Sequence, residues 1–217
     1  MASQVKSKVD VPELIDRRRA QFINAASELF GRQGYHVTTI RQIAQAAGVS
    51  VGLIYQYVED KEDILFLALL DVLNAYEQQI PNAIKDLVDP LERLIAAVQA
   101  YCHVNDQNVN GTVLAYRETK SLQKARRALI QAKELKTNAL IARCIQDCIK
   151  IELIDPAIDV ELLTYQFVMF SHAWALKAWR FRSMMTVDLY VERGLNLMLH
   201  SVLSTRGKKI YARRKSI

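Results

Sequence analysis

Side chains that could contact a polyanion are concentrated in one short stretch of the chain. Residues 38–61 combine hydroxyl, aromatic and basic side chains: Thr38, Thr39, Arg41, Ser50, Tyr55, Tyr57 and Lys61. Hydroxyls and cations donate hydrogen bonds to phosphate oxygens, and aromatic rings and amides can contact base edges. Lys61 alone would more commonly be a solvated surface charge. The clustering of these side chains within 24 residues favours a nucleic-acid surface.

Two short helices separated by a glycine-containing turn would position those side chains. The first helix begins at Thr38 or Thr39 and buries a face with helical spacing, formed by Ile40, Ile43, Ala44 and Ala47. Residues 48–50 make the turn, and the second helix runs from Ser50 to about Val58. This pattern predicts a helix-turn-helix, whose second helix enters the major groove of DNA.

The second helix has a face that its own packing does not use. This face consists of Val51, Gly52, Tyr55 and Gln56, because Ile54 and Val58 are directed inward. Glycine inside a helix costs about 1 kcal/mol relative to alanine, so Gly52 suits a point at which DNA comes close. Lys61 opposes the dipole in the first turn of the next helix, where it would complete a phosphate site.

The remaining sequence predicts an all-α protein of about nine helices. Glycine and proline are scarce, at seven and four residues, and helix-favouring residues are abundant. The other expected helices span residues 12–32, 60–79, 90–103, 112–120, 123–152, 159–181 and 186–204. Pro81 is expected to end the fourth helix, and residues 105–111 are expected to form a loop.

The excess positive charge lies in the C-terminal tail. The net charge is +6, and residues 206–217 contain six Lys or Arg and no acid, so the other 23 basic residues equal the 23 acidic ones. The tail could touch DNA or anionic lipid, although a solvated tail is the commoner case. Three cysteines without an export signal, and no apolar run long enough to cross a bilayer, predict a cytoplasmic protein without a membrane association.

The last two long helices predict a homodimer. Residues 160–181 carry apolar side chains around the whole helix, and residues 187–202 carry an apolar stripe with further leucines outside it. A helix that is apolar on every side must be covered on every side, so these two helices would form a four-helix bundle with a second copy. The alternative is that they form only the core of a single chain.

Residues 23–65 resemble a known family of DNA-binding domains. The sequence "INAASELFGRQGYHVTTIRQIAQAAGVSVGLIYQYVEDKEDIL" is similar to that of TetR/AcrR-type transcriptional regulators across about a quarter of the chain. Leu53 and Val58 depart from the commonest family pattern, which has a small or polar residue and a phenylalanine there. The resemblance implies a three-helix helix-turn-helix domain followed by a larger C-terminal helical domain for effector binding and dimerisation.

The resemblance also implies roles for individual residues. The base-facing residues would be Arg41, Val51, Gly52, Leu53, Tyr55 and Gln56, and the phosphate-binding residues would be Thr39, Ser50, Tyr57 and Lys61. The expected function is that of a ligand-released repressor, acting as a homodimer on a palindromic duplex operator. The expected domains are an arm (1–16), the DNA-binding domain with its linking helix (17–76), the effector and dimerisation domain (77–205) and the basic tail (206–217).

A small-molecule effector is expected in the C-terminal part. Its candidate pocket residues are Tyr101, Val113, Tyr116, Arg117, Phe167, Phe170 and Trp174, each of which is more commonly a plain core residue. The basic stretch 120–133 could hold the phosphates of an acyl-coenzyme A, a ligand class that some members of the family use. An apolar metabolite with an acidic or phosphorylated end is therefore the expected effector.

No catalytic, cofactor or metal motif stands out in the sequence. Nucleotide-binding glycine loops, nucleophile elbows and zincin motifs are all missing from it. Cys144 and Cys148 are one helical turn apart but have no second ligand pair, and His103 and His172 stand alone. Two alternatives to the effector-controlled regulator stay open: a DNA-binding protein without an effector, and an all-helical enzyme.

Overall fold

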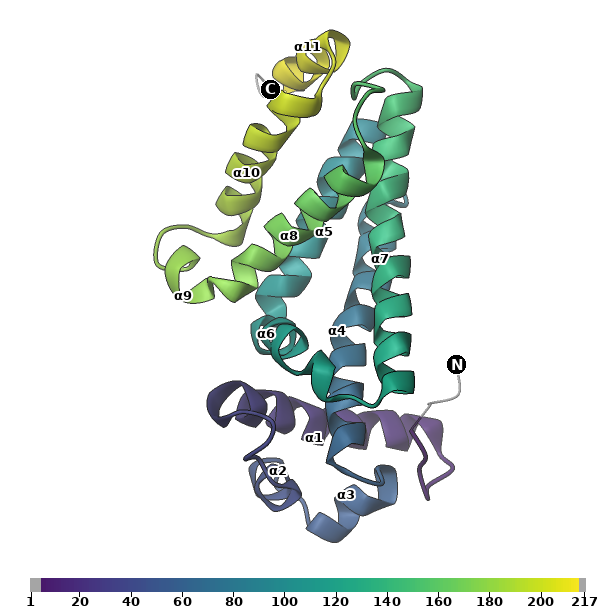
Figure 1. Ribbon diagram of the computed structural model, residues 1–217, viewed down its shortest axis with the longest axis vertical. Helices are drawn as coiled ribbons and strands as arrows, with labels where there is room; N and C mark the ends of the chain where they lie inside the picture. Colours follow the sequence, from purple (N-terminus) through teal and green to yellow (C-terminus); the bar gives the residue numbers. More distant parts are fainter. Residues whose placement is uncertain (1–4, 215–217) are drawn as a thin grey trace. The chain divides into compact units, whose positions relative to one another are not determined.

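Residues 5–214, which the computed structural model describes, form eleven α-helices and one 3₁₀ turn (Figure 1). The elements are α1 (Pro12–Gln33), α2 (Ile40–Ala46), α3 (Val51–Tyr57), α4 (Lys61–Ile84), α5 (Pro90–Gln107), α6 (Val109–Glu118), η1 (Thr119–Ser121), α7 (Lys124–Lys150), α8 (Val160–Leu176), α9 (Ala178–Phe181), α10 (Val187–Val202) and α11 (Thr205–Arg214). The predicted all-α fold is confirmed. The two helices beyond the expected nine are α9, which separates from α8 at Lys177, and α11.

The helices gather into two compact units. Unit 1 contains the described residues up to Val72 together with Asn110–Gln131, and unit 2 contains Leu73–Val109 together with the described residues from Ala132 onward. The division therefore does not follow a single point along the chain. Residues 110–131, which include α6 apart from Val109, η1 and the start of α7, group with the N-terminal helices.

In unit 1, the first three helices pack against one another around a shared apolar core. Phe22, Ala26 and Phe30 of α1 are buried together with Ile43 of α2 and Ile54 of α3. Gly34 and Gly48 adopt positive φ angles of 93° and 65° at the ends of α1 and α2, where the chain must turn sharply. These short helices therefore depend on tertiary burial, because each of α2 and α3 is only seven residues long.

In unit 2, α5 is the central helix and contacts both α8 and α10 (Figure 1). Leu91, Leu94 and Val98 of α5 are buried, as are Phe167 of α8 and Leu199 of α10. The apolar spacing seen in the sequence thus becomes a helical core. No helix within residues 5–214 is both long enough and apolar enough to cross a membrane.

Two predicted interruptions of the helices were wrong. Helix α4 continues through Pro81 to Ile84, because the fully buried Ile80 and Tyr76 anchor this turn and offset the hydrogen bond that proline lacks. Residues 105–111 are helical apart from Asn108, because Asn105 is buried and donates its side-chain amide to the Tyr101 carbonyl at 3.0 Å. The Tyr76 hydroxyl of α4 also donates to the Asn105 side chain at 2.8 Å, so this polar residue, expected in a loop, is held by hydrogen bonds within α5 and to α4.

The basic tail is helical as far as Arg214, and α11 packs against residues 152–153, which follow α7. A Cβ atom on Gly207 would lie 2.1 Å from the carbonyl oxygen of Leu153, so the two backbones are in close contact. Tyr211 is buried, and the Ser204 hydroxyl donates to the Glu152 carbonyl at 2.6 Å. The expectation of a tail outside the packed structure was wrong for these residues, because Gly207 permits the close approach. Residues 215–217 lie outside the described part of the chain.

Candidate nucleic-acid interface

Local hydrogen bonds define the start of each helix in the helix-turn-helix. The Thr39 hydroxyl accepts from the Gln42 amide at 3.2 Å, and the Gln42 side chain accepts from the Thr39 backbone at 2.8 Å, which completes a capping box. The Ser50 hydroxyl accepts from the Leu53 amide at 3.1 Å. Both caps are at positions that the sequence predicted, and both hydroxyls remain at the surface.

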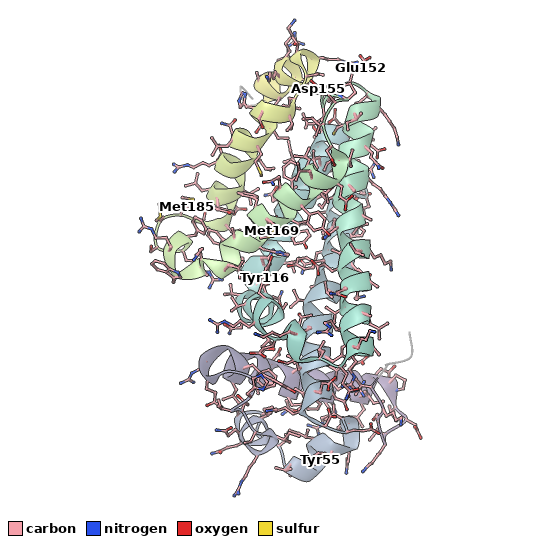
Figure 2. All side chains as sticks on the ribbon, in the orientation of Figure 1. Tyr55, Tyr116, Glu152, Asp155, Met169 and Met185 are labelled. Atoms are coloured by element: carbon pink, nitrogen blue, oxygen red, sulfur yellow. The ribbon has the colours of Figure 1, made fainter. Side chains whose placement is uncertain are left out.

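The outer face of α3 is open to solvent. Tyr55 is 42% exposed, and Gln56, Gly52 and Arg41 of α2 are also exposed, whereas Val51 and Leu53 are half-buried. Figure 2 shows Tyr55 on α3 in this part of unit 1. A Cβ atom on Gly52 would meet no atom of this chain closer than the Ser50 hydroxyl oxygen, at 3.9 Å. Packing within the chain therefore does not require glycine at this position.

Three members of the original polar cluster face inward. Thr38 is fully buried, and its hydroxyl donates to the Gly34 carbonyl at 2.7 Å. The Tyr57 ring is 3% exposed and belongs to the core of unit 1. Both side chains are therefore buried inside unit 1, and the exposed part of the polar cluster is smaller than the sequence indicated.

Lys61, the third inward-facing residue, closes the loop between α1 and α2. Its ammonium group donates to the carbonyls of Tyr35 at 2.9 Å, His36 at 3.1 Å and Thr38 at 2.9 Å. It also lies 4.5 Å from the centre of the Tyr35 ring. Burial lowers the pKa of Lys61, which the nearby Glu118 carboxylate partly opposes. These three carbonyls occupy all three ammonium protons, so a phosphate contact would require breaking one of these bonds.

Sequence reasoning missed a second buried cation in unit 1. Arg19 is 4% exposed, and its guanidinium donates to the Tyr57 carbonyl at 2.8 Å and to the Val5 carbonyl at 2.8 Å. Arg19 thereby joins α1 to the end of α3 and to the N-terminal arm. The signal was present, because Arg19 precedes the buried Phe22 and Ala26 by three and seven residues and so shares their face of α1.

A third cation, Arg126, joins the start of α7 to the start of α4 within unit 1. Its guanidinium pairs with the carboxylate of Asp63, which is 1% exposed, and lies 3.4 Å from Glu62. The other Asp63 oxygen accepts from the Glu59 amide at 2.6 Å, directly after α3. The Glu62 carboxylate also accepts from the Gln123 amide at 3.0 Å. Residues 123–126 are therefore fixed to the segment that follows α3.

The candidate pocket residues do not fall in one unit. Tyr101, Phe167 and Trp174 are buried in unit 2, where Phe170 is half-buried. Val113, Tyr116 and Arg117 lie on α6 in unit 1, with Tyr116 49% exposed. The predicted set is thus divided between the two units, because α6 groups with the N-terminal helices.

The residues considered as metal ligands have other environments. Cys144 and Cys148 are buried, and burial raises the pKa of the Cys144 thiol. His103 lies 2.9 Å from Asp188, and His172 lies 3.2 Å from the Tyr101 hydroxyl. No group of three His, Cys, Asp or Glu side chains in the described residues is arranged to hold a metal ion.

Apolar side chains are exposed on the two helices for which dimerisation was predicted. Leu162, Tyr165 and Met169 occur at i, i+3 and i+7 on α8, with exposures of 60%, 36% and 46%. Leu197 on α10 is 76% exposed. Met169 is visible on α8 in Figure 2. Both helices belong to unit 2 and contact α5, so each has one buried face and one apolar exposed face.

Comparison with known proteins agrees with the helix-turn-helix assignment. Residues 22–68 match the family model of bacterial regulatory proteins of the tetR family, and residues 87–175 match that of the tetracyclin repressor-like C-terminal domain. The chain is 50% identical to the HTH-type transcriptional regulator HbdR of Aromatoleum sp. (strain CIB) over 212 residues, covering 98% of this chain and 92% of that protein. The chain belongs to the TetR family and is a transcriptional regulator of that family.

Solved structures share the fold. The ketosteroid transcriptional regulator KstR2 of Mycobacterium tuberculosis superposes with a TM-score of 0.74 at 20% identity, covering 94% of this chain and 98% of that one. A structure of AibR in complex with isovaleryl coenzyme A and operator DNA gives a TM-score of 0.72 at 21% identity, covering 83% of this chain and 97% of that one. At these identities the likeness concerns the fold.

Proposed function

We propose that the protein is a ligand-released repressor that binds a palindromic operator as a homodimer. The observation that carries the DNA-binding part is the exposed face of α3 and α2, formed by Arg41, Gly52, Tyr55 and Gln56. Val51 and Leu53, half-buried at its edge, would add apolar base contacts. Thr39 and Ser50, at the two helix starts, would bind phosphates. Tyr57 and Lys61 are left out of the proposed phosphate contacts because of their inward partners.

The base-reading role is tested by substitutions on α3. Tyr55→Ala or Gln56→Ala is expected to cost about 1–3 kcal/mol of discrimination at particular base pairs. Fluorescence anisotropy with an operator obtained by selection from random duplexes would measure it against unrelated DNA. Tyr116→Ala is the matched control, since Tyr116 is a similarly exposed tyrosine on α6. Equal losses on operator and unrelated DNA would remove base reading from this face.

The dimer is proposed from the exposed apolar side chains of α8 and α10. Two identical recognition helices would lie one DNA turn apart, ~34–36 Å, on a palindromic site. Met169→Glu or Leu197→Glu places a charge in the proposed interface and should yield monomers in sedimentation. Leu135→Glu, at a 59% exposed leucine of α7, is the control and should leave the dimer unchanged.

The effector is proposed to be an acyl-coenzyme A. Support comes from the AibR structure, which contains isovaleryl coenzyme A, and from Lys120 and Lys124, which are exposed cations in the basic stretch 120–133. Arg126 and Lys133 of that stretch are engaged in ion pairs with Asp63 and Glu77. Fewer cations than the sequence indicated are therefore available for the phosphates of the ligand.

Release from DNA requires the effector to bind the DNA-incompetent form better than the DNA-bound form. A coupling of about 1–3 kcal/mol would weaken operator binding about 5–150-fold. Operator affinity measured with a panel of coenzyme A thioesters, paired with thioester affinity measured with operator, tests the switch. A thioester that binds tightly while neither affinity changes would exclude it as the effector.

A further inference from the structure

Unit 2 buries a group of polar side chains where four of its helices meet. This core cluster consists of Tyr76 on α4, Tyr101 and Asn105 on α5, Asn138 on α7 and His172 on α8. None of the five is more than 7% exposed. Their rings are in contact, with the centroids of Tyr76 and Tyr101 4.1 Å apart and those of Tyr101 and His172 5.4 Å apart.

The side chains of Tyr76 and Asn105 in the core cluster form hydrogen bonds within unit 2. The Tyr76 hydroxyl donates to the side-chain oxygen of Asn105 at 2.8 Å. The Asn105 amide nitrogen in turn donates to the Tyr101 backbone carbonyl at 3.0 Å. These bonds connect α4 to α5 and satisfy both ends of the Asn105 side chain.

Tyr101, His172 and Asn138, the other members with side-chain bonds in the core cluster, leave one buried donor without an acceptor. The Tyr101 hydroxyl lies 3.2 Å from Nε2 of His172 and 3.4 Å from Oδ1 of Asn138. Burial lowers the pKa of His172 to about 4, so the ring is neutral near pH 7 and one nitrogen carries a proton. With that proton on Nε2, the chain of bonds runs from His172 to Tyr101 to Asn138. The Nδ2 atom of Asn138 then has no acceptor.

The unsatisfied Nδ2 atom of Asn138 differs from the other buried polar atoms that lack a hydrogen bond. Four such side-chain atoms occur in residues 5–214, and those of Glu77, Arg93 and Arg126 belong to groups that form ion pairs. Nδ2 of Asn138 belongs to a neutral side chain that is 4% exposed. An unsatisfied buried amide is destabilising, so its presence requires a reason other than the stability of this form.

We propose that the Asn138 amide is the polar anchor of an effector site among α4, α5, α7 and α8, and that it binds the carbonyl oxygen of an acyl thioester. The proposal rests on the effector function proposed above and assigns its recognition to particular residues. The incoming carbonyl accepts the Nδ2 hydrogen bond that the closed core lacks. Because the core cluster is closed in this structure, ligand entry parts at least two of these helices.

The chemistry of the core cluster favours an uncharged ligand end. Its members contribute hydroxyls, amides and a neutral imidazole, and none of them is a lysine or an arginine. A buried carboxylate would therefore find no cation among these five residues to offset its loss of hydration. The thioester carbonyl is an acceptor without charge. The free acid of the same acyl group is expected to bind more weakly than the thioester.

A surface groove between α4 and α5 is the rival location. It has a volume of about 750 Å³ and is lined largely by amides and alanines: Gln78, Gln79, Asn82, Ala83, Ala96, Gln99, Ala100, His103 and Gln107. Gln78 and Asn82 are exposed to solvent, and the Gln79 amide donates to the Gln107 side chain at 3.2 Å, so a ligand there would exchange one partner for another. The Nδ2 atom of Asn138 has no such partner to lose.

The test compares Asn138→Leu with Gln99→Leu in the full chain. Isothermal titration with isovaleryl coenzyme A and with aromatic acyl-coenzyme A thioesters measures binding, and free coenzyme A and the free acids are the controls. Asn138→Leu should weaken thioester binding about tenfold while leaving free coenzyme A binding unchanged. Gln99→Leu should leave thioester binding unchanged. Loss of binding in Gln99→Leu alone would assign the ligand to the groove and overturn the proposal.

A second measurement needs no ligand. Asn105→Leu removes the acceptor of the Tyr76 hydroxyl and should lower the melting temperature. Asn138→Leu removes the unsatisfied Nδ2 and a 3.4 Å acceptor of the Tyr101 hydroxyl, which can donate to Nε2 of His172 instead, and should leave the melting temperature unchanged or raised. A large fall for Asn138→Leu would show that Asn138 is a structural partner and would overturn the proposal. If the stability contrast holds but the wild type binds none of the thioesters, the acyl-coenzyme A effector is wrong and the thioester site fails with it.

Discussion

The two units use buried polar groups in opposite ways. In unit 1 three buried or half-buried cations, Arg19, Lys61 and Arg126, donate to backbone carbonyls or pair with carboxylates. In unit 2 the core cluster is built from neutral hydroxyls, amides and an imidazole. One set joins segments through charge, and the other set joins helices through weaker neutral bonds.

The difference is physically consistent with the proposed roles. Hydrogen bonds from a charged donor are stronger than neutral ones, and removing such a donor leaves its carbonyl partners unsatisfied. The cation contacts of unit 1 therefore hold its helices in one geometry. Neutral hydrogen bonds are weaker individually and can be exchanged for bonds to a ligand at small net change in free energy. A rigid reading head and an adaptable ligand core are therefore expected in the same chain.

Replacing Arg19 should have the largest effect on this comparison. Arg19→Leu should lower the free energy of unfolding by about 3 kcal/mol, because the carbonyls of Tyr57 and Val5 lose a charged donor in a buried position. Urea denaturation followed by circular dichroism would measure it. Arg17→Leu, in the same turn of α1 but exposed, should change stability by no more than about 0.5 kcal/mol. Equal effects would mean that the carbonyl contacts of Arg19 contribute little.

The neutral core of unit 2 should give a pH dependence of similar size. The pKa of His172 is lowered by burial to about 4, so between pH 6.5 and 4 the unfolded chain binds a proton that the folded chain does not. This contribution to stability is complete above pH 6.5 and is lost as the pH falls, by about 3 kcal/mol at pH 4.

The His172 contribution is separated from that of the carboxylates by substitution. Unfolding free energies of the wild type and of His172→Gln, measured from pH 7 to 4, should converge as the pH falls. His200→Gln, at an exposed histidine of α10, should retain the wild-type slope. Parallel curves for the wild type and His172→Gln would indicate that His172 titrates alike in the folded and unfolded chains.

The Arg126 pair should have an intermediate effect. Arg126→Met leaves the buried Asp63 carboxylate without its cation and should lower the free energy of unfolding by about 2 kcal/mol, less than for a fully buried pair because Arg126 is 22% exposed. The double variant Arg126→Met/Asp63→Asn should recover part of the loss in the same urea titration. Additive losses of unfolding free energy would mean that Arg126 and Asp63 stabilise unit 1 independently of each other.

Lys61 should give the smallest effect. Lys61→Met should lower the free energy of unfolding by about 1 kcal/mol through the three carbonyls it leaves, and the salt dependence of operator binding should stay unchanged. A slope of log affinity against log salt that falls by about one would instead place Lys61 on a phosphate. That outcome would mean that DNA binding breaks at least one of the three hydrogen bonds from Lys61 to backbone carbonyls.

The helix-turn-helix could be predicted from the sequence because its determinants are local. Thr39 and Ser50 cap helices through residues three positions ahead, and Ile43 and Ile54 are placed by helical spacing. The exposure of Tyr55 and Gln56 follows from the same spacing. Caps, turn and apolar face all depend on residues within one or two helical turns.

The partners of the buried polar groups could not be predicted in this way. Arg19 binds a carbonyl 38 residues away, Lys61 binds one 26 residues away and Arg126 pairs with a residue 63 positions away. Helix α4 continues through Pro81, and α11 packs on Leu153, because of burial that no local pattern encodes. The sequence by itself determined the helices and the exposed face of α3 through short-range spacing. Tertiary packing decided which polar side chains remain available to a ligand, because that depends on which distant donors and acceptors the fold brings together.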